Sequence, residues 1–430
     1  MRSFYQSAFK KLNFFKRAAF ILTLVFITIL GSVNAQSVTV NTTIDENNGN
    51  TTSIAALIST PGGAGISIRE AVLAANNEPS GSTVNITIPA GNYSITIAGV
   101  DNTGQLGDID VLVAAVAGNK TVNIIGAGAA TTIITGLAGE RIFEVHANSV
   151  AGSSIAFSIT GVTLTGGSPA TSSGGAILAG RPGDVTTVTN CIFSNNVSTN
   201  AGGALSVSSG SASHNLTVTG CSFTNNTSNG SGAAISFNGN GTSTITIDQN
   251  TFTNNTSSAS SGGAINISGT APGPNLCKIT RNTFTANTAN VGGAAINAVN
   301  VVTINANYNR IVGNNSTAVG GKMILGTGGV ITTFNKDNNW WGVNTGPAAA
   351  EISDVTGTPA ANWLQLKSSA SPVTACVGGT STVTSGFLSN SAGSAVSVAN
   401  LTPEMIGLPV TFSAILGTLS AAQQIGRAHV

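Results

Sequence analysis

Charged side chains are scarce in this sequence: Asp, Glu, Lys and Arg make up 7% of its 430 residues, and aromatic residues make up 5%. The formal net charge is +1, but residues 1–35 contribute five basic residues and no acidic ones. The remainder holds 11 basic against 15 acidic residues, a balance of −4. Such a chain lacks the basic surface that binds phosphate backbones, so we expect no nucleic-acid partner. Its abundant Val, Ile, Ala and Thr argue against disorder.

Cysteine is also rare, at four residues, and no pair has the C-x-x-C spacing of a metal site. Cys191 and Cys221 each stand two residues before a phenylalanine, which places them at the same point of a repeating unit. We expect them to be stacked thiols in the core. A disulfide between them is left open, because an exported chain meets oxidising conditions and the sequence gives no geometry. The other two are Cys277 and Cys376.

Long apolar runs are absent except near the N-terminus, where residues 18–30 form a run of 13. Basic residues precede this run, and the small residues Val33 and Ala35 stand just before Gln36. This order predicts a secretory signal peptide over residues 1–35. A membrane anchor is the alternative, but a spanning helix needs ~20 apolar residues. We therefore expect an exported protein with no transmembrane segment in its mature part.

Two short elements recur along the chain with a period close to thirty residues. A Gly-Gly-Ala-Ile element has intervals of 28 to 30 residues, and a Phe-x-Asn-Asn element has intervals of 27 to 32. Two unrelated elements with one period predict a solenoid, in which each unit packs only on its neighbours. The first element begins at Gly174, Gly202, Gly232, Gly262, Gly292 and Gly320, and the second begins at Phe193, Phe223, Phe252, Phe284 and Ile311.

Within each unit the apolar residues alternate with polar ones, as in residues 216–218 and 245–247. A period of two indicates strands, and Gly, Asn and Ser turns separate them. The units contain no helical pattern. We therefore predict an all-β fold, a right-handed parallel β-helix of the pectin-lyase-like kind over residues 105–347, with about eight coils spaced ~4.8 Å apart.

The repeated phenylalanines are expected to stack in the core and the repeated asparagines to form a ladder at a turn. An asparagine row that binds sugar is the alternative. Replacing Phe223 by alanine is expected to cost ~3–5 kcal/mol. Replacing Asn226 is expected to cost less, because one hydrogen bond contributes only about 1 kcal/mol net. The predicted ladder consists of Asn195, Asn226, Asn255, Asn287 and Asn315.

The repeats over residues 161–342 resemble those of the chlamydial polymorphic outer-membrane proteins and related β-helix adhesins. Residues 67–72, Ser-Ile-Arg-Glu-Ala-Val, resemble the CSLREA motif near the start of exported bacterial β-helix proteins, although Ile66 stands where that family has Cys. Residues 107–111 and 141–145 continue this resemblance. It implies a β-helix exported to the extracellular space or the outer-membrane surface.

Independently of this resemblance, residues 67–72 have the pattern of the start of a helix. Ser67 followed by Glu70 predicts a capping box. An open β-helix end exposes unpaired strand groups, and a short amphipathic helix would cover it. We assign this helix to residues 66–77, within an N-terminal cap region over residues 36–104.

The C-terminal end of the repeats carries Trp340 and Trp341. They are predicted to cap the last coil, and a ligand-binding platform that stacks on sugar rings is the alternative. Residues 348–365 are predicted to be a linker. Residues 366–424 are similar to the start of a bacterial immunoglobulin-like domain and too few for a complete one. Residues 425–430 resemble a non-native tail.

Catalytic chemistry is poorly represented. A glycoside hydrolase needs paired carboxylates, and a lyase needs carboxylates around Ca²⁺ with a base. Between residues 161 and 341 the only acids are Asp184, Asp248 and Asp337. Arg281 and Arg310 are predicted to have no acidic partner in register, and the two histidines of the mature body, His146 and His214, stand in no motif.

The one tight acidic pair is Asp108 and Asp110, a weak candidate for Ca²⁺ because two ligands are too few. We therefore expect no catalytic residue and no cofactor. The sequence favours a non-catalytic, adhesin-like scaffold that binds extracellular polysaccharide or a host or neighbouring cell surface. A polysaccharide lyase or glycoside hydrolase of the same fold is the alternative.

Overall fold

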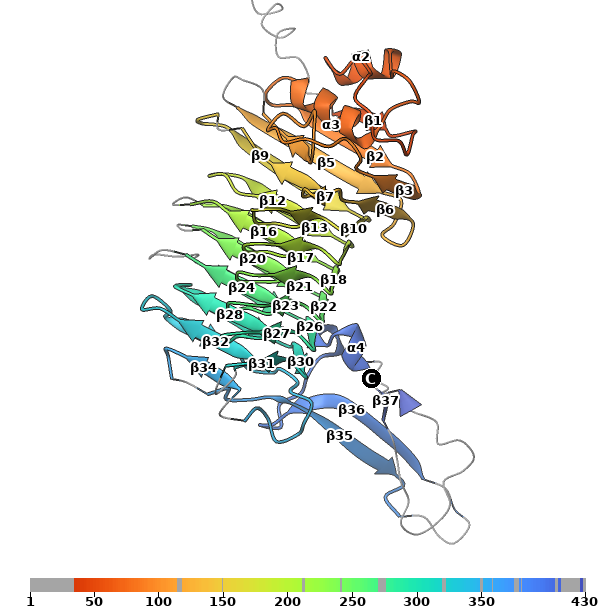
Figure 1. Ribbon diagram of the computed structural model, residues 1–430. Helices are drawn as coiled ribbons and strands as arrows, with labels where there is room; N and C mark the ends of the chain where they lie inside the picture. The colour runs from red at the N-terminus through yellow and green to blue at the C-terminus, as the bar shows by residue number, and fades with distance from the viewer. Residues whose placement is uncertain are drawn as a thin grey trace, which may run out of the picture.

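The computed structural model shows an all-β protein whose parallel strands stack into a β-solenoid of about eight turns (Figure 1). Residues 1–34 of the predicted signal peptide lie outside the described residues, as do Cys376 and His429. The described part covers residues 35–410 and 426–427, except 114–117, 149, 211–212, 240–241, 270–275, 319–321, 349–350, 358, 375–378, 380 and 407–408.

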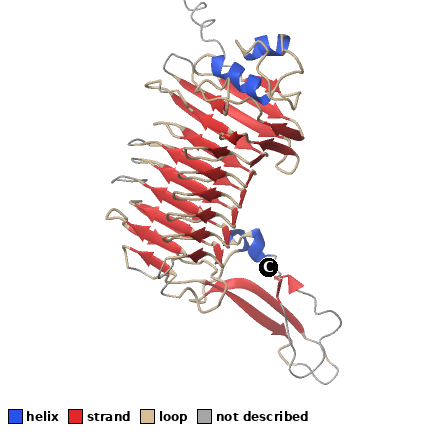
Figure 2. Ribbon diagram, in the orientation of Figure 1, coloured by secondary structure: helices blue, strands red, loops and turns tan. Residues whose placement is uncertain are grey.

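Three long parallel sheets form the faces of the solenoid (Figures 1 and 2). The first has ten strands: β1 (Gln36–Thr39), β2 (Thr83–Ile88), β5 (Asn119–Gly126), β9 (Ser154–Thr160), β13 (Val185–Thr189), β17 (Asn215–Thr219), β21 (Thr244–Asp248), β25 (Leu276–Thr280), β29 (Thr303–Asn307) and β33 (Thr333–Asn335). The second has eight: β3 (Gly91–Ser94), β6 (Thr132–Thr135), β10 (Thr163–Thr165), β14 (Ile192–Ser194), β18 (Ser222–Thr224), β22 (Thr251–Thr253), β26 (Thr283–Thr285) and β30 (Arg310–Val312).

The third sheet has nine strands: β4 (Ile109–Val111), β8 (Phe143–Val145), β12 (Ile177–Ala179), β16 (Leu205–Ser208), β20 (Ile235–Asn238), β24 (Ile265–Ser268), β28 (Ile296–Val299), β32 (Ile324–Thr327) and β34 (Ile352–Asp354). Two small sheets fill a corner: β7 (Ala138–Gly139) with β11 (Ser168–Pro169), and β15 (Val197–Ser198), β19 (Thr227–Ser228), β23 (Thr256–Ser257), β27 (Thr288–Ala289) and β31 (Asn315–Ser316).

The stacking extends beyond the limits predicted from the repeats. Strand β1 pairs with β2 in the ten-stranded sheet, so parallel stacking begins at Gln36 rather than near residue 105. Strand β34, inside the predicted linker, pairs with β32. The repeat signal misses both ends because their side chains do not copy the Gly-Gly-Ala-Ile and Phe-x-Asn-Asn elements.

The predicted aromatic stack is confirmed. Phe193, Phe223, Phe252 and Phe284 stand in register on neighbouring coils and are fully buried. Their successive ring centroids lie 4.7, 5.0 and 4.9 Å apart, and the rings are nearly parallel, with interplanar angles of 4° to 10°. Each ring therefore fills the space between the rings above and below it.

The asparagine ladder exists, but two of its predicted members are wrong. Asn195 and Asn315 are exposed, and their neighbours Asn196 and Asn314 take the ladder positions. In each coil the residue before the ladder asparagine has a positive φ, which turns the asparagine inward, as at Asn195 with φ 56°. The ladder thus consists of Asn196, Asn226, Asn255, Asn287 and Asn314.

A second ladder runs along another turn and was not predicted. Each of its first three members donates its side-chain amide to the next member's Oδ1 and to a backbone carbonyl of the preceding coil. Cys191 and Cys221 occupy the same position in the first coils, where they are buried free thiols. The prediction that these two cysteines are stacked thiols in the core therefore agrees with the structure. The asparagines of this ladder are Asn250, Asn282, Asn309 and Asn339.

Two helices cover the N-terminal end of the solenoid, α2 (Ile54–Ser59) and α3 (Ile68–Asn77) (Figure 2). Helix α3 begins with the predicted capping box, in which Ser67 accepts from the Glu70 backbone N–H and the Glu70 side chain accepts from the Ser67 backbone N–H. Arg69 of this helix is fully buried. Its guanidinium donates to both Asp45 carboxylate oxygens and to the carbonyls of residues 104, 107 and 108.

At the other end the solenoid meets a two-stranded antiparallel ribbon, β35 (Leu364–Ser371) and β36 (Thr382–Asn390). Trp340 packs against this ribbon and lies 4.8 Å from Phe387, centroid to centroid. The remaining elements are η1 (Val398–Asn400), α4 (Pro403–Ile406), β37 (Pro409–Val410) and β38 (Gly426–Arg427), the last within the predicted tail. Among the described residues, no helix has the length and hydropathy to cross a membrane.

Candidate functional site

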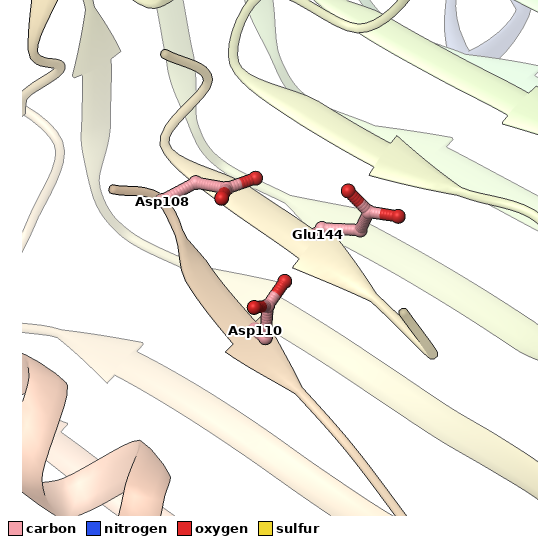
Figure 3. A group of neighbouring side chains, drawn as sticks. All are labelled: Asp108, Asp110 and Glu144. Carbon is pink, nitrogen blue, oxygen red and sulfur yellow. The ribbon is translucent and has the colours of Figure 1, made fainter. Parts of the chain in front are cut away.

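Three carboxylates meet where the cap joins the first coils. Asp108 precedes β4, Asp110 lies on β4, and Glu144 lies on β8 as the register partner of Asp110. One oxygen from each lies within 4.8 Å of the others. Figure 3 shows the three side chains turned toward one another. The predicted pair thus gains a third carboxylate, which sequence reasoning missed although residues 141–145 were singled out.

The cluster is largely buried, and its carboxylate oxygens differ in whether they have hydrogen-bond partners. Asp110 is 0% exposed, and its Oδ2 accepts a 2.8 Å hydrogen bond from the Gly104 N–H. Its Oδ1 has no hydrogen-bond partner among the described atoms. Arg141 lies between the other two carboxylates, with Nη1 3.2 Å from Asp108 Oδ2 and in contact with Glu144. Burial, and then the nearby Asp108, raise the pKa of Asp110 to about 8.

A second buried polar group joins His146, Asp184 and Ser153. Nδ1 of His146 lies 3.0 Å from Asp184 Oδ1, and Nε2 lies 3.1 Å from Ser153 Oγ. Residue His146 has a positive φ of 63°. A hollow of about 180 Å³ opens beside it, lined also by Arg181. Sequence reasoning missed this group because its members come from three different segments.

The hydrogen-bonded order Ser153–His146–Asp184 is that of a hydrolytic triad, but Ser153 and Asp184 also bond to the backbone. Ser153 Oγ lies 2.5 Å from the Val150 carbonyl oxygen, so its proton points to that carbonyl and not to His146. Asp184 also accepts from the backbone N–H of Ile155. A serine nucleophile must give its proton to the histidine during attack. The group therefore ties two coils together.

His214 makes the stability of the solenoid sensitive to acid. It is almost fully buried, and its Nε2 lies 2.9 Å from Thr186 Oγ1. Burial lowers its pKa to about 4, from 6.5, while the facing Asp184 acts against this shift and the facing His146 adds to it. Because the folded state binds this proton less readily than the unfolded chain, His214 favours folding above pH ~6.5, and this contribution is lost as the pH falls toward 4.

We predict that His214→Gln flattens the pH dependence of unfolding. Between pH 6.5 and 4 the wild type should lose roughly 3 kcal/mol more of its free energy of unfolding than the variant does. Urea unfolding at several pH values measures this difference. Parallel curves for the two proteins would show that the imidazole is not held in its neutral form.

The acids within the coils have hydrogen-bond or ion-pair partners. Contrary to expectation, Arg281 has an acidic partner: its Nε donates to Asp248 Oδ1 at 2.9 Å. Asp248 also accepts from Thr280 Oγ1. Arg310 donates to Thr285 Oγ1. Arg281 reaches Asp248 because it directly follows Thr280, the register partner of Asp248 on the next coil. The sequence hides this pairing because the coils differ in length.

The ligand-platform alternative for the paired tryptophans does not fit the structure. Trp340 and Trp341 are 7% and 5% exposed, so neither offers a ring face to a sugar. Half-buried Trp363 instead borders a hollow of about 430 Å³ with Ser353 and Asp354. Trp363 lies within the predicted linker, and no motif in the sequence distinguished it from the residues around it.

The outer face of the ten-stranded sheet is broad and almost uncharged. Among its described strands, only Asp248 and Lys278 place charged side chains outward. Its central row stays in register across nine coils and alternates with buried apolar side chains. Hydroxyl and amide groups dominate this row: Asn85, Asn123, Ser158, Thr187, Thr217, Thr246, Lys278, Asn305 and Asn335.

Comparisons with protein-family models, with curated proteins and with solved structures find no match.

Proposed function

We propose that this protein is an exported, non-catalytic, adhesin-like scaffold that binds neutral polysaccharide outside the cell. The observation that carries this proposal is the outer face of the ten-stranded sheet. It offers hydroxyls and amides at the spacing of stacked strands, ~4.8 Å, on a rigid backbone. Neutral glycans present matching hydroxyls and no charge, and such an extended face gives many weak contacts at once.

The coil acids support a scaffold over a polysaccharide lyase or glycoside hydrolase. Asp184 is held by His146 and a backbone amide, and Asp248 is held by Arg281 and a threonine hydroxyl. Glycoside cleavage needs two carboxylates that converge on one bond and one that can give up a proton. Carboxylates already committed to structural partners do not provide this pair.

The rest of the proposal concerns architecture and location. We propose a right-handed winding, since parallel crossover connections in proteins are almost always right-handed. The antiparallel ribbon of β35 and β36 supports the start of an immunoglobulin-like module, which would act as a spacer. The apolar run in residues 18–30 after basic residues supports export, to the extracellular space or the outer-membrane surface.

Co-sedimentation with insoluble cellulose, chitin and starch tests the proposal. We predict saturable binding of the wild type to at least one of them, and a loss of at least about tenfold for the double variant Thr187→Lys/Thr217→Lys, because each lysine brings a hydrated charge to the face. Lys278 stands in the same row, so the fold accepts lysine there. The matched control is Thr224→Lys/Thr253→Lys, on the outer side of the eight-stranded sheet.

Four results would contradict the proposal. The first is a wild type that sediments with none of the polymers, and the second is an equal loss of binding in both double variants. Loss of binding in Trp363→Ala, with the sheet variants unaffected, would move the site to the hollow beside β34. Release of reducing ends or unsaturated products from pectin, alginate or chondroitin would favour the lyase or hydrolase alternative.

A further inference from the structure

We infer that Asp108, Asp110 and Glu144 form a binding site for one divalent cation of the calcium class, which joins β4 to β8. This site lies at the capped end of the solenoid and is independent of the polysaccharide-binding face. Its first support is geometric, since one oxygen from each carboxylate lies within 4.8 Å of the others. A single ion between them could contact all three.

The second support is the unpartnered oxygen of Asp110. This side chain is 0% exposed, and its Oδ1 has no hydrogen-bond partner among the described atoms. A buried carboxylate oxygen without a donor is costly, because it has lost water and gained nothing in return. Figure 3 shows the Asp110 carboxylate facing Asp108 and Glu144, where a cation would supply the missing partner.

The charge of the cluster matches a divalent ion. Once a cation displaces the proton of Asp110, the three carboxylates carry −3, and Arg141, which contacts Asp108 and Glu144, contributes +1. The resulting −2 is neutralised by one M²⁺. The Nη2 of Arg141 also donates to Ser172 Oγ at 2.8 Å, which holds the guanidinium in place beside these two carboxylates. A guanidinium so held can share two carboxylates with an ion.

The donor set selects the kind of ion. The cluster has only carboxylate oxygens, with no histidine or cysteine, so it suits a hard cation rather than zinc or copper. Calcium accepts irregular arrangements of six to eight oxygens, whereas magnesium demands a regular octahedron and keeps its waters. The burial of Asp108 and Asp110 favours the ion that sheds water more easily.

The position of the site gives the ion a structural consequence. Asp110 and Glu144 are register partners on neighbouring parallel strands, so two like charges face each other across the β4–β8 interface once both are ionised. Asp108 follows the turn whose carbonyls bind Arg69 of helix α3. A bound cation would therefore hold the cap to the first coil.

Calcium titration of the full chain, stripped with EDTA, tests the inference. We expect saturable one-to-one binding by isothermal titration calorimetry and a rise in the melting temperature with calcium. Asp110→Asn and Glu144→Gln should each weaken binding at least tenfold and abolish the thermal shift. The control Asp248→Asn, at a carboxylate paired with Arg281, should bind as the wild type does.

The variants also separate an ion site from a merely structural cluster. Without calcium, Asp110→Asn should melt no lower than the wild type, because asparagine keeps an acceptor for the Gly104 N–H and replaces the unpartnered oxygen with an amide donor that faces two carboxylates. No heat and no thermal shift in the wild type at about 10 mM calcium, above the ~1 mM dissociation constants of weak extracellular sites, would overturn the inference. Calcium binding that survives in both cluster variants would overturn it too. Neither result depends on polysaccharide binding.

Discussion

Replacing Asn226 by alanine is expected to destabilise the solenoid about as much as replacing Phe223 by alanine, by roughly 3–5 kcal/mol in the free energy of unfolding. Asn226 is fully buried, and its Oδ1 accepts from both the backbone N–H and the side-chain amide of Asn196. Its own Nδ2 donates to the Phe193 carbonyl and to Asn255 Oδ1.

The sequence alone predicted a smaller cost for Asn226, because it counted one hydrogen bond. In the structure alanine leaves the Asn196 backbone N–H and one of the two hydrogens of its side-chain amide without an acceptor, and it removes a donor from the Phe193 carbonyl. Each such group costs about 1–3 kcal/mol, more than the net value of a hydrogen bond. The asparagine is therefore a hub of the turn rather than a single link.

Urea unfolding and limited proteolysis of both variants measure these costs. In a solenoid the loss falls on one coil and its two interfaces, so cleavage should appear near residue 226 before the whole array melts. Asn225→Gly is the matched control, because Asn225 is exposed and glycine keeps its φ of 56°. If Asn226→Ala costs under about 1 kcal/mol while Phe223→Ala costs its full amount, the simpler estimate from sequence is right.

Removing the guanidinium of Arg69 is expected to detach the cap. In Arg69→Met the Asp45 carboxylate keeps its backbone donors at residues 96 and 97 but loses its counter-charge in a buried site. Three carbonyls of the turn before β4 also lose their donors. Breaking a buried ion pair from one side typically costs ~3–5 kcal/mol. We expect a lower melting temperature and early proteolysis within residues 36–110.

The same substitution at an exposed pair provides the control. Arg281 pairs with Asp248, but its side chain is 31% exposed. Arg281→Met should therefore cost no more than about 1 kcal/mol. The double variant Asp45→Asn/Arg69→Met should recover part of the loss, because no uncompensated charge remains. Equal melting temperatures for the wild type and Arg69→Met would show that this ion pair does not hold the cap.

The coil interior follows from the sequence because its register is local. Each ladder asparagine stands three positions after the stacked Phe, or after Ile311, of its coil, as Asn226 does after Phe223. Applied strictly, that spacing selects Asn196 and Asn314, so the two wrong assignments came from the doubled asparagines and not from a missing signal. The cap helix was likewise predictable, because a capping box depends on residues three apart.

Polar contacts between side chains of neighbouring coils could not be predicted from the sequence, because the number of residues between the two partners varies from contact to contact. Asp110 meets Glu144 across 34 residues, Asp184 meets His146 across 38, and Asp248 meets Arg281 across 33. Each separation includes turns of differing length, and a one-residue slip moves a side chain to the other face. The third carboxylate of the cluster therefore needed the structure.

The two asparagine ladders give the rod the logic of a one-dimensional crystal. The repeating unit is one coil, which is 30 residues long from Phe193 to Phe223 and 29 from Phe223 to Phe252. The ladder and stacking contacts between coils recur from one unit to the next. Duplication or loss of one whole unit would leave the remaining contacts intact and change the length by ~4.8 Å. An insertion of one residue within a strand would instead shift the register and turn the following side chains of that strand to the other face. The length of such a molecule therefore changes in steps of one coil, and duplication of a whole repeat in the gene adds one step.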